Sequence, residues 1–290
     1  MTGRAQRLRF VEAKATQAAR VERMLRIGCV KYLNAHPLIR GWPGEVDFDH
    51  PSTLCKRLAD GELDVALVSS FEFLRNPIYR IVDDVSISSD GPVYSVVVAH
   101  QGDISEIQEI ELDPASQTAV NLLRCLLAEL GLSPGLTRCS TGVLPVGQAG
   151  VSPAGAKRIS RERARLLIGD QAIAFRQSHG DELEFWDLGE QWKNLVELPF
   201  VYALWLIRPE FRDTKRVAQR LRALRNKNLS NLDQLIAAEN GFDSQFCSRY
   251  YREHLRFGFG EKEKQGLRTF ADLCAKHGLL EKCDVALDLV

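Results

Sequence analysis

Polar side chains gather where short apolar runs of the sequence end. They carry hydroxyl, amide or carboxyl groups: Asn34, Ser69, Ser70, Ser86, Ser88, Ser89, Ser95, Ser116, Thr118 and Asp170. In open α/β sheets, ligands bind beyond the carboxyl ends of the strands, and helix starts there offer unpaired N–H groups to anions. These residues therefore predict a cleft for a small anion. The alternative for Ser69, Ser70, Ser116 and Thr118 is a helix N-cap worth about 1 kcal/mol, with no ligand.

Titratable groups are sparse among these segments. His36 is a candidate general base because an unperturbed histidine titrates at about pH 6.5, and a packed or surface histidine is the alternative that we favour. Asp170 is a candidate ligand or a cap of the following helix, and we favour the cap. Spacing alone assembles no Ser-His-Asp arrangement.

Short apolar runs alternate with helical patterns, which predicts an α/β protein. Strands are predicted at 25–30, 45–49, 63–68, 92–99, 108–112, 165–168, 183–187 and 199–207. Helices are predicted at 51–60, 116–130, 211–226, 232–240, 242–255 and 261–277. Two other segments are predicted to be irregular. Residues 86–92 form a turn, and the glycines and prolines of 131–160 exclude a regular element and indicate a long loop, either a lid or a disordered insertion.

The N-terminal residues 1–23 are Arg-rich and lack the apolar core of a secretory signal. Met24 directly precedes the first strand-like run. We therefore expect either that Met24 is the natural start instead of Met1 or that 1–23 is a loose appendage. A transit peptide is the alternative interpretation.

Composition limits the class of protein. The 290 residues are 45% hydrophobic and carry 38 basic and 38 acidic side chains, which suits two lobes and opposes a broad nucleic-acid surface. The basic run 212–227 is interpreted as a solvated helix face. Seven cysteines without a C-x-x-C pair indicate reduced thiols and a cytoplasmic protein. No run reaches the roughly 18 apolar residues of a membrane helix, and no nucleotide or metal motif is present.

The order of motifs resembles the MqnA/MqnD family of the futalosine route to menaquinone. The matching segments share both sequence and spacing with the MqnA branch, chorismate dehydratase, and are 26–38, 61–72, 86–95, 116–118, 167–170, 187–193 and 198–205. Three positions depart from the family pattern. Ala119 replaces a serine, Val196-Glu197 replaces Thr-Gly, and 131–160 has no counterpart.

The resemblance implies a two-lobed periplasmic-binding-protein-like fold of type II, with the ligand in a cleft between the lobes. Residues 24–94 and 206–290 would form lobe 1, and 95–205 would form lobe 2, with crossings near Ser95 and near Tyr202 to Trp205. It further implies substrate-binding roles for six polar side chains: Asn34, Ser70, Ser89, Ser95, Ser116 and Thr118.

The reaction implied is loss of water from chorismate to give 3-[(1-carboxyvinyl)oxy]benzoate, without a redox cofactor or a metal. No enzyme base is evident, so we hypothesise that the enolpyruvyl carboxylate of the substrate takes the ring proton. Two alternatives remain: a non-catalytic binding protein on the same fold and the sister dihydroxynaphthoate synthase activity. A nucleic-acid-binding function ranks last. The sequence leaves the oligomeric state open.

Overall fold

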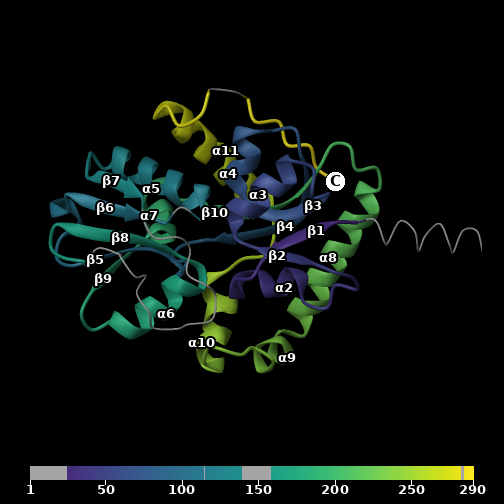
Figure 1. The fold of residues 1–290 in the computed structure, drawn as a ribbon, viewed down its shortest axis with the longest axis horizontal. Helices are drawn as coiled ribbons and strands as arrows, with labels where there is room; N and C mark the ends of the chain where they lie inside the picture. The colour runs from purple at the N-terminus through teal and green to yellow at the C-terminus, as the bar shows by residue number, and fades with distance from the viewer. Residues whose placement is uncertain (1–24, 114, 139–157, 282–283) are drawn as a thin grey trace, which may run out of the picture.

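The computed structural model describes residues 25–113, 115–138, 158–281 and 284–290, and the chain forms two five-stranded sheets that lie side by side (Figure 1). The first sheet has the order β2-β1-β3-β10-β4. Strand β1 runs parallel to β2 and β3, and β10 runs antiparallel to β3 and β4. The bounds are β1 Ile27–Val30, β2 Asp47–Asp49, β3 Val65–Ser69, β4 Arg80–Ser89 and β10 Phe200–Ile207.

The second sheet repeats this pattern, with the order β7-β6-β8-β5-β9. Strand β6 is parallel to β7 and β8, and β5 is antiparallel to β8 and β9. In each sheet, one strand runs antiparallel to both of its neighbours: β10 lies between β3 and β4, and β5 lies between β8 and β9. The bounds are β5 Val96–His100, β6 Glu109–Leu112, β7 Gly135–Arg138, β8 Arg163–Ile168 and β9 Glu184–Asp187.

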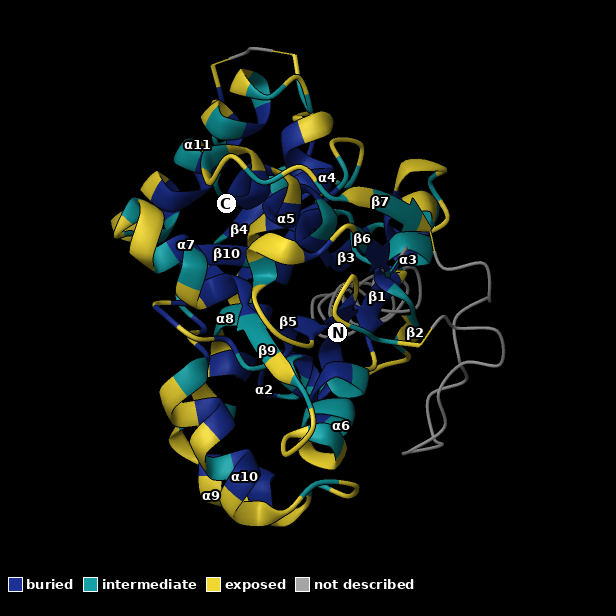
Figure 2. Cartoon of the chain, turned by 90° about the vertical axis from the view of Figure 1, so that its left-hand side faces the viewer, coloured by how far each residue is buried: buried dark blue, intermediate teal, exposed yellow. Residues whose placement is uncertain are grey.

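Helices cover both sheets and bury the central strands, whereas the edge strands β2 and β7 stay partly exposed (Figure 2). The helices before β10 are η1 Leu33–Ala35, α2 His36–Ile39, α3 Pro51–Ala59, α4 Ser70–Arg75, η2 Ile104–Glu106, α5 Gln117–Glu129, α6 Gly169–His179 and α7 Leu188–Val196. Those after it are α8 Thr214–Ser230, α9 Leu232–Ala237, α10 Ser244–Arg249, the π-helical turn η3 Tyr250–His254 and α11 Glu261–Lys276. None of the helices in the described ranges is long and apolar enough to cross a membrane.

The chain crosses between the sheets twice. The first crossing is 90–95, and it is held by Asp187 of β9, whose carboxylate accepts hydrogen bonds from the backbone N–H groups of Val93 at 3.0 Å and Tyr94 at 2.7 Å. The second crossing is 197–199, because the whole of β10 pairs with β3 and β4 of the first sheet. The family resemblance implies this crossing a few residues later, near Tyr202 to Trp205.

Two segments predicted to be irregular are strands. Ser86, Ser88 and Ser89 belong to β4, where the serine hydroxyls are buried but not orphaned: Ser86 Oγ donates to the Gly258 carbonyl, and the Ser88 backbone pairs with Arg256. The partners lie far along the chain, so local sequence could not reveal them. Within 131–160, residues 135–138 form β7 beside β6, and 139–157 lie outside the described residues, as does 1–23.

The basic run on α8 is not a uniformly solvated face. Arg225 is buried, and its guanidinium donates to the Phe257 carbonyl at 2.9 Å and to Asp84 at 2.6 Å. Arg222 donates to the carbonyl oxygen of Val290 at 2.7 Å, and so holds the chain end along the free edge of β4. These arginines serve the fold, because each donates hydrogen bonds to main-chain oxygens of segments distant in sequence.

Candidate active site

A narrow cavity of about 60 Å³ lies between the two sheets. Its wall takes residues from the carboxyl ends of β1, β3 and β8, from the first crossing and from the start of α5: Val30, Tyr32, Asn34, Pro51, Leu67, Val68, Ser69, Ile87, Val93, Ser95, Val96, Ser116, Ala119, Ile168, Gly169, Tyr202 and Ala203. This is the place where open α/β sheets bind ligands.

Asn34 reaches the cavity from the short helix η1. Its side-chain oxygen Oδ1 is buried and has no hydrogen-bond partner within the described part of the chain. A buried polar atom without a partner costs about 1–3 kcal/mol. A ligand that donates a hydrogen bond to Oδ1 would recover that free energy.

Ser95 lies at the end of the first crossing and is fully buried. Its hydroxyl oxygen accepts a hydrogen bond of 2.7 Å from Tyr250, a residue that the sequence analysis did not single out. Its backbone carbonyl accepts from the Gly169 N–H at 2.8 Å, which fixes the crossing against the start of α6. Tyr250 is separated from Ser95 by 155 residues, so no local pattern could have linked them.

The hydroxyls at the start of α5 divide into two groups. Ser116 lines the cavity and caps α5, because its Oγ accepts from the Ala119 N–H at 3.2 Å. Thr118 lies behind the wall, where its Oγ1 accepts from the Phe71 N–H at 3.1 Å and contacts the hydroxyl of Ser69. Ser70 also lies behind the wall and donates to the Val201 carbonyl at 2.7 Å. Thr118 therefore ties α5 to the end of β3 and the start of α4, whereas the Ser70 bond joins α4 to β10 within the first sheet.

Ser89 stands one layer behind the cavity as well. Its Oγ donates to the Gly91 carbonyl at 2.9 Å and lies 3.1 Å from the hydroxyl of Tyr202, which does line the cavity. Of the six side chains predicted to bind substrate, Asn34, Ser95 and Ser116 line the cavity, whereas Ser70, Ser89 and Thr118 support its wall. Tyr202 also lines the cavity, a role that its sequence context does not predict.

The titratable candidates lie outside the wall. His36 Nδ1 is 2.8 Å from Glu239 Oε2, which fits the interpretation of His36 as a packed residue. Asp170 lies in the first turn of α6 without capping that helix. Instead its Oδ1 accepts from the Leu33 N–H at 2.9 Å, and burial raises its pKa to about 6. Asp170 thus fastens α6 to the turn that carries Asn34.

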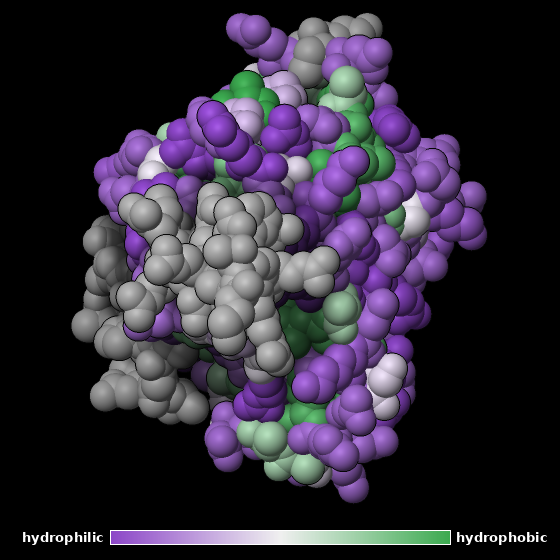
Figure 3. Space-filling view, turned by 90° about the vertical axis from the view of Figure 1, so that its right-hand side faces the viewer, coloured by the Kyte–Doolittle hydropathy of each residue, from purple (hydrophilic) through white to green (hydrophobic). Residues whose placement is uncertain are grey.

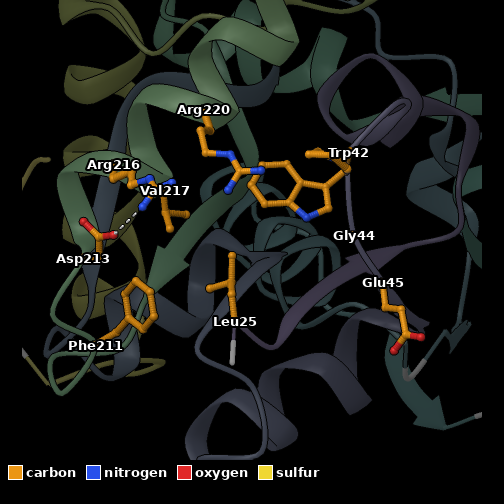
Figure 4. A pocket seen from close by; sticks show the side chains of 10 residues that line it. Leu25, Trp42, Gly44, Glu45, Phe211, Asp213, Arg216, Val217 and Arg220 are labelled. Carbon is orange, nitrogen blue, oxygen red and sulfur yellow. Dashed lines mark ion pairs between the residues drawn. The ribbon is translucent and has the colours of Figure 1, made fainter. Parts of the chain in front are cut away.

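A larger hollow of about 360 Å³ lies elsewhere, between the start of the described chain and α8 (Figure 4). The Arg220 guanidinium stacks 4.8 Å from the ring centroid of Trp42, and Asp213 pairs with Arg216 at 3.9 Å. The surface on the side of α8 is mostly hydrophilic, with small hydrophobic patches between charged residues (Figure 3). We assign the site to the smaller cavity, because its wall brings together polar residues from both sheets, Asn34 and Ser69 from the first and Ser116 from the second.

Comparisons with known proteins identify the fold and the family. A protein from Archaeoglobus fulgidus shares the fold with a TM-score of 0.61 at 16% identity, and the match covers 88% of this chain and 98% of that one. The alkanesulfonate-binding protein from Xanthomonas axonopodis pv. citri matches with a TM-score of 0.58 at 16% identity, covering 89% of this chain and 94% of that one. A Candida albicans protein described as having the periplasmic binding protein fold matches with a TM-score of 0.56 at 12% identity, over 90% and 92% of the chains. The fold is therefore α/β, two-lobed and periplasmic-binding-protein-like, as the sequence predicted.

Sequence comparison is more specific. The chain is 30% identical to chorismate dehydratase of Thermus thermophilus over 254 residues, which cover 85% of this chain and 93% of that protein. The family model described as menaquinone biosynthesis matches residues 25–276. The chain belongs to this menaquinone biosynthesis family.

Proposed function

We propose that this protein is a hydro-lyase that converts chorismate into 3-[(1-carboxyvinyl)oxy]benzoate for menaquinone biosynthesis. The family membership and the 30% identity to the chorismate dehydratase of T. thermophilus support the reaction. One observation carries the proposal into this structure: Asn34 lines a cavity between the two sheets, and its buried Oδ1 has no partner among the described residues. A substrate hydroxyl is the donor that this acceptor lacks.

The cavity wall suits a small dianion with a hydroxyl group. Ser69, Ser95 and Ser116 line the space, the hydroxyls of Ser95 and Ser116 can donate to carboxylates, and apolar side chains of β1, β3 and β8 can pack around the ring. We infer that these serines and Asn34 contact the substrate, while Ser70, Ser89 and Thr118 hold the wall that positions them.

The proton acceptor follows from the composition of the wall. Among the described residues that line the cavity, none has a carboxylate, an imidazole or an amine. The phenols of Tyr32 and Tyr202 have pKa values raised by burial, so they are poor bases at neutral pH. We infer that the enolpyruvyl carboxylate of chorismate removes the ring proton as the neighbouring hydroxyl leaves, and that the protein supplies orientation.

A pH–rate profile tests this assignment of the base. The account predicts the same profile for His36→Ala as for the wild type, and a limb near pH 6, if one is present, should belong to Asp170 and be absent from Asp170→Asn. A bell-shaped limb that disappears in His36→Ala would transfer the role to the imidazole.

Incubation with chorismate tests the proposed function itself. Formation of an aromatic product one water lighter than chorismate, followed by ultraviolet absorbance and mass, is the expected result. If chorismate stays intact and raises the melting temperature, a non-catalytic binding protein takes the place of the lyase. A product with a naphthoate skeleton from a different substrate would indicate the sister activity.

The setting of the enzyme is also part of the proposal. We infer a cytoplasmic enzyme that binds neither nucleic acid nor membrane, supported by the free thiols of the described cysteines, Cys29, Cys55, Cys125, Cys247 and Cys274. The sulfur atoms of Cys125 and Cys274 lie 3.7 Å apart, within hydrogen-bond distance, and form no disulfide. Cell fractionation tests the location.

A further inference from the structure

Tyr250 is held rigidly behind the cavity. It begins the π-helical turn Tyr250–His254 that directly follows α10, and its side chain is fully buried. Its ring stacks on Phe246, with centroids 5.6 Å apart and planes inclined by 16°. Single π-helical turns are rare and occur often at functional sites. The ring position is thus fixed by packing, which leaves the hydroxyl aimed in one direction.

That hydroxyl stands between two polar residues of the cavity. It donates a 2.7 Å hydrogen bond to Ser95 Oγ, and the side chain of Asn34 lies close to it. Tyr250 itself does not line the cavity, whereas Ser95 and Asn34 both do. Tyr250 can therefore act on a ligand only through these two side chains.

The directions of these hydrogen bonds determine what the cavity offers. A serine oxygen that accepts from tyrosine keeps its own hydrogen for another acceptor, so Ser95 is left as a donor. Asn34 Oδ1 is a buried atom without a partner among the described residues, and an amide oxygen can only accept, so Asn34 is left with an acceptor. One donor and one acceptor are thereby presented together.

We propose that Tyr250 is a positioning residue that sets Ser95 as the donor, beside the acceptor of Asn34, for the substrate hydroxyl that leaves. The proposal rests on the proposed dehydratase function. In the reaction the substrate carboxylate takes the neighbouring ring proton, the electron pair of that C–H bond forms the new ring double bond, and the C–O bond of the hydroxyl breaks. The proton then passes from the carboxyl group to the departing hydroxide, so that water leaves and the carboxylate is restored. Ser95 donates to the departing oxygen, and Asn34 accepts from its hydrogen. A substrate without a hydroxyl at this position would leave both groups unpaired, so the pair also selects the substrate.

The test compares Tyr250→Phe, Ser95→Ala, the double variant and a matched control, Tyr79→Phe. Tyr79 is also a buried tyrosine, but it lies outside the cavity wall. We expect Tyr250→Phe to lower kcat about 10-fold and to change KM less than about 2-fold, because the lost orientation matters most in the transition state. Ser95→Ala should lower kcat about 100-fold, and the double variant should be no slower, because both changes remove one function. Tyr79→Phe should keep the kcat of the wild type.

Two outcomes would overturn the inference while the proposed function stands: a kcat of Tyr250→Phe equal to that of the wild type, or losses in Tyr250→Phe and Ser95→Ala that multiply in the double variant. A wild type that forms no product would overturn the proposed function, and the inference with it. If Tyr250→Phe fails to fold, 3-fluorotyrosine at position 250 keeps the shape and makes the phenol a stronger donor. A changed kcat at an unchanged melting temperature then supports the inference, and an unchanged kcat overturns it.

Discussion

The Asp170 carboxylate accepts a hydrogen bond of 2.9 Å from the backbone N–H of Leu33, which joins helix α6 of the second sheet to the turn that carries Asn34. Burial raises the pKa of Asp170 to about 6, and the Leu33 N–H only partly opposes this effect. The geometry of the cavity therefore depends on a carboxyl group that changes its charge in mildly acidic solution.

Stability should depend on pH through Asp170. Its folded-state pKa of about 6 lies above the ordinary value of 3.8, so its contribution is fully present below about pH 4 and is lost as the pH rises through about 6. Asp170→Asn keeps an acceptor for Leu33 and cannot ionise. The free energy of unfolding of the wild type, relative to Asp170→Asn, should fall by about 3 kcal/mol between pH 4 and pH 7. Denaturant unfolding at both pH values measures it, and parallel pH curves would contradict the prediction.

Thr118→Val should destabilise the contact between the two sheets. The substitution keeps the shape but leaves the buried N–H of Phe71 without its 3.1 Å acceptor and removes the contact with the Ser69 hydroxyl. We expect a loss of about 1–3 kcal/mol in the free energy of unfolding. Thr269→Val on α11 is the control, because its hydroxyl donates to Gln265 at the surface. Equal stabilities of the two variants would show that Thr118 does not join the sheets.

Glu197→Gly should stabilise the protein. Glu197 ends α7 with φ at 62°, in the left-handed region, and its side chain is exposed. Glycine adopts this conformation without the steric cost of about 1–2 kcal/mol that other residues bear. We expect a gain of about 1 kcal/mol in thermal or denaturant unfolding. Leu195→Gly, inside the same helix, should instead lose about 1 kcal/mol. A decrease in stability for both variants would refute this interpretation.

Ala119→Ser should strengthen substrate binding. Ala119 lines the cavity next to Ser116, at a position where the family carries a serine. An added hydroxyl that reaches a substrate carboxylate contributes about 1 kcal/mol, which corresponds to a KM about 5-fold lower. Ala128→Ser, on the exposed side of the same helix, should leave KM unchanged. A KM that rises in Ala119→Ser alone would mean that the hydroxyl obstructs the ligand.

The elements with clear hydrophobic periodicity were predictable. The pattern at 51–60 gave a helix that the structure has as α3, and 116–130 corresponds to α5 between its serine cap and the glycine that follows. Eight predicted strands are present, each within a few residues of its expected bounds. Burial on both faces makes such strands continuous apolar runs.

Elements that depend on distant partners were not predictable. Strand β4 resembles a turn in sequence because its buried serines bond to residues near 256–258. Helix α6 was missed because its apolar residues lack a regular spacing, with only Gly169, Ala172 and Ile173 buried. The same limit applies to the site: Asn34, Ser95 and Ser116 follow strands and could be found, whereas Tyr250 reaches them from the C-terminal helices.

The turnover of Asn34→Ala tests the central claim most directly, because that residue carries the unpartnered acceptor of the cavity. Chorismate consumption and product mass are measured for the wild type, Asn34→Ala and the control Asn231→Ala, whose exposed amide donates only to Lys227. The account predicts a wild type that forms the dehydrated product, an Asn34→Ala variant slower by about 100-fold in kcat, and a control like the wild type. Equal kcat values for the wild type and Asn34→Ala would contradict it, since the cavity would then not be the place where water is lost.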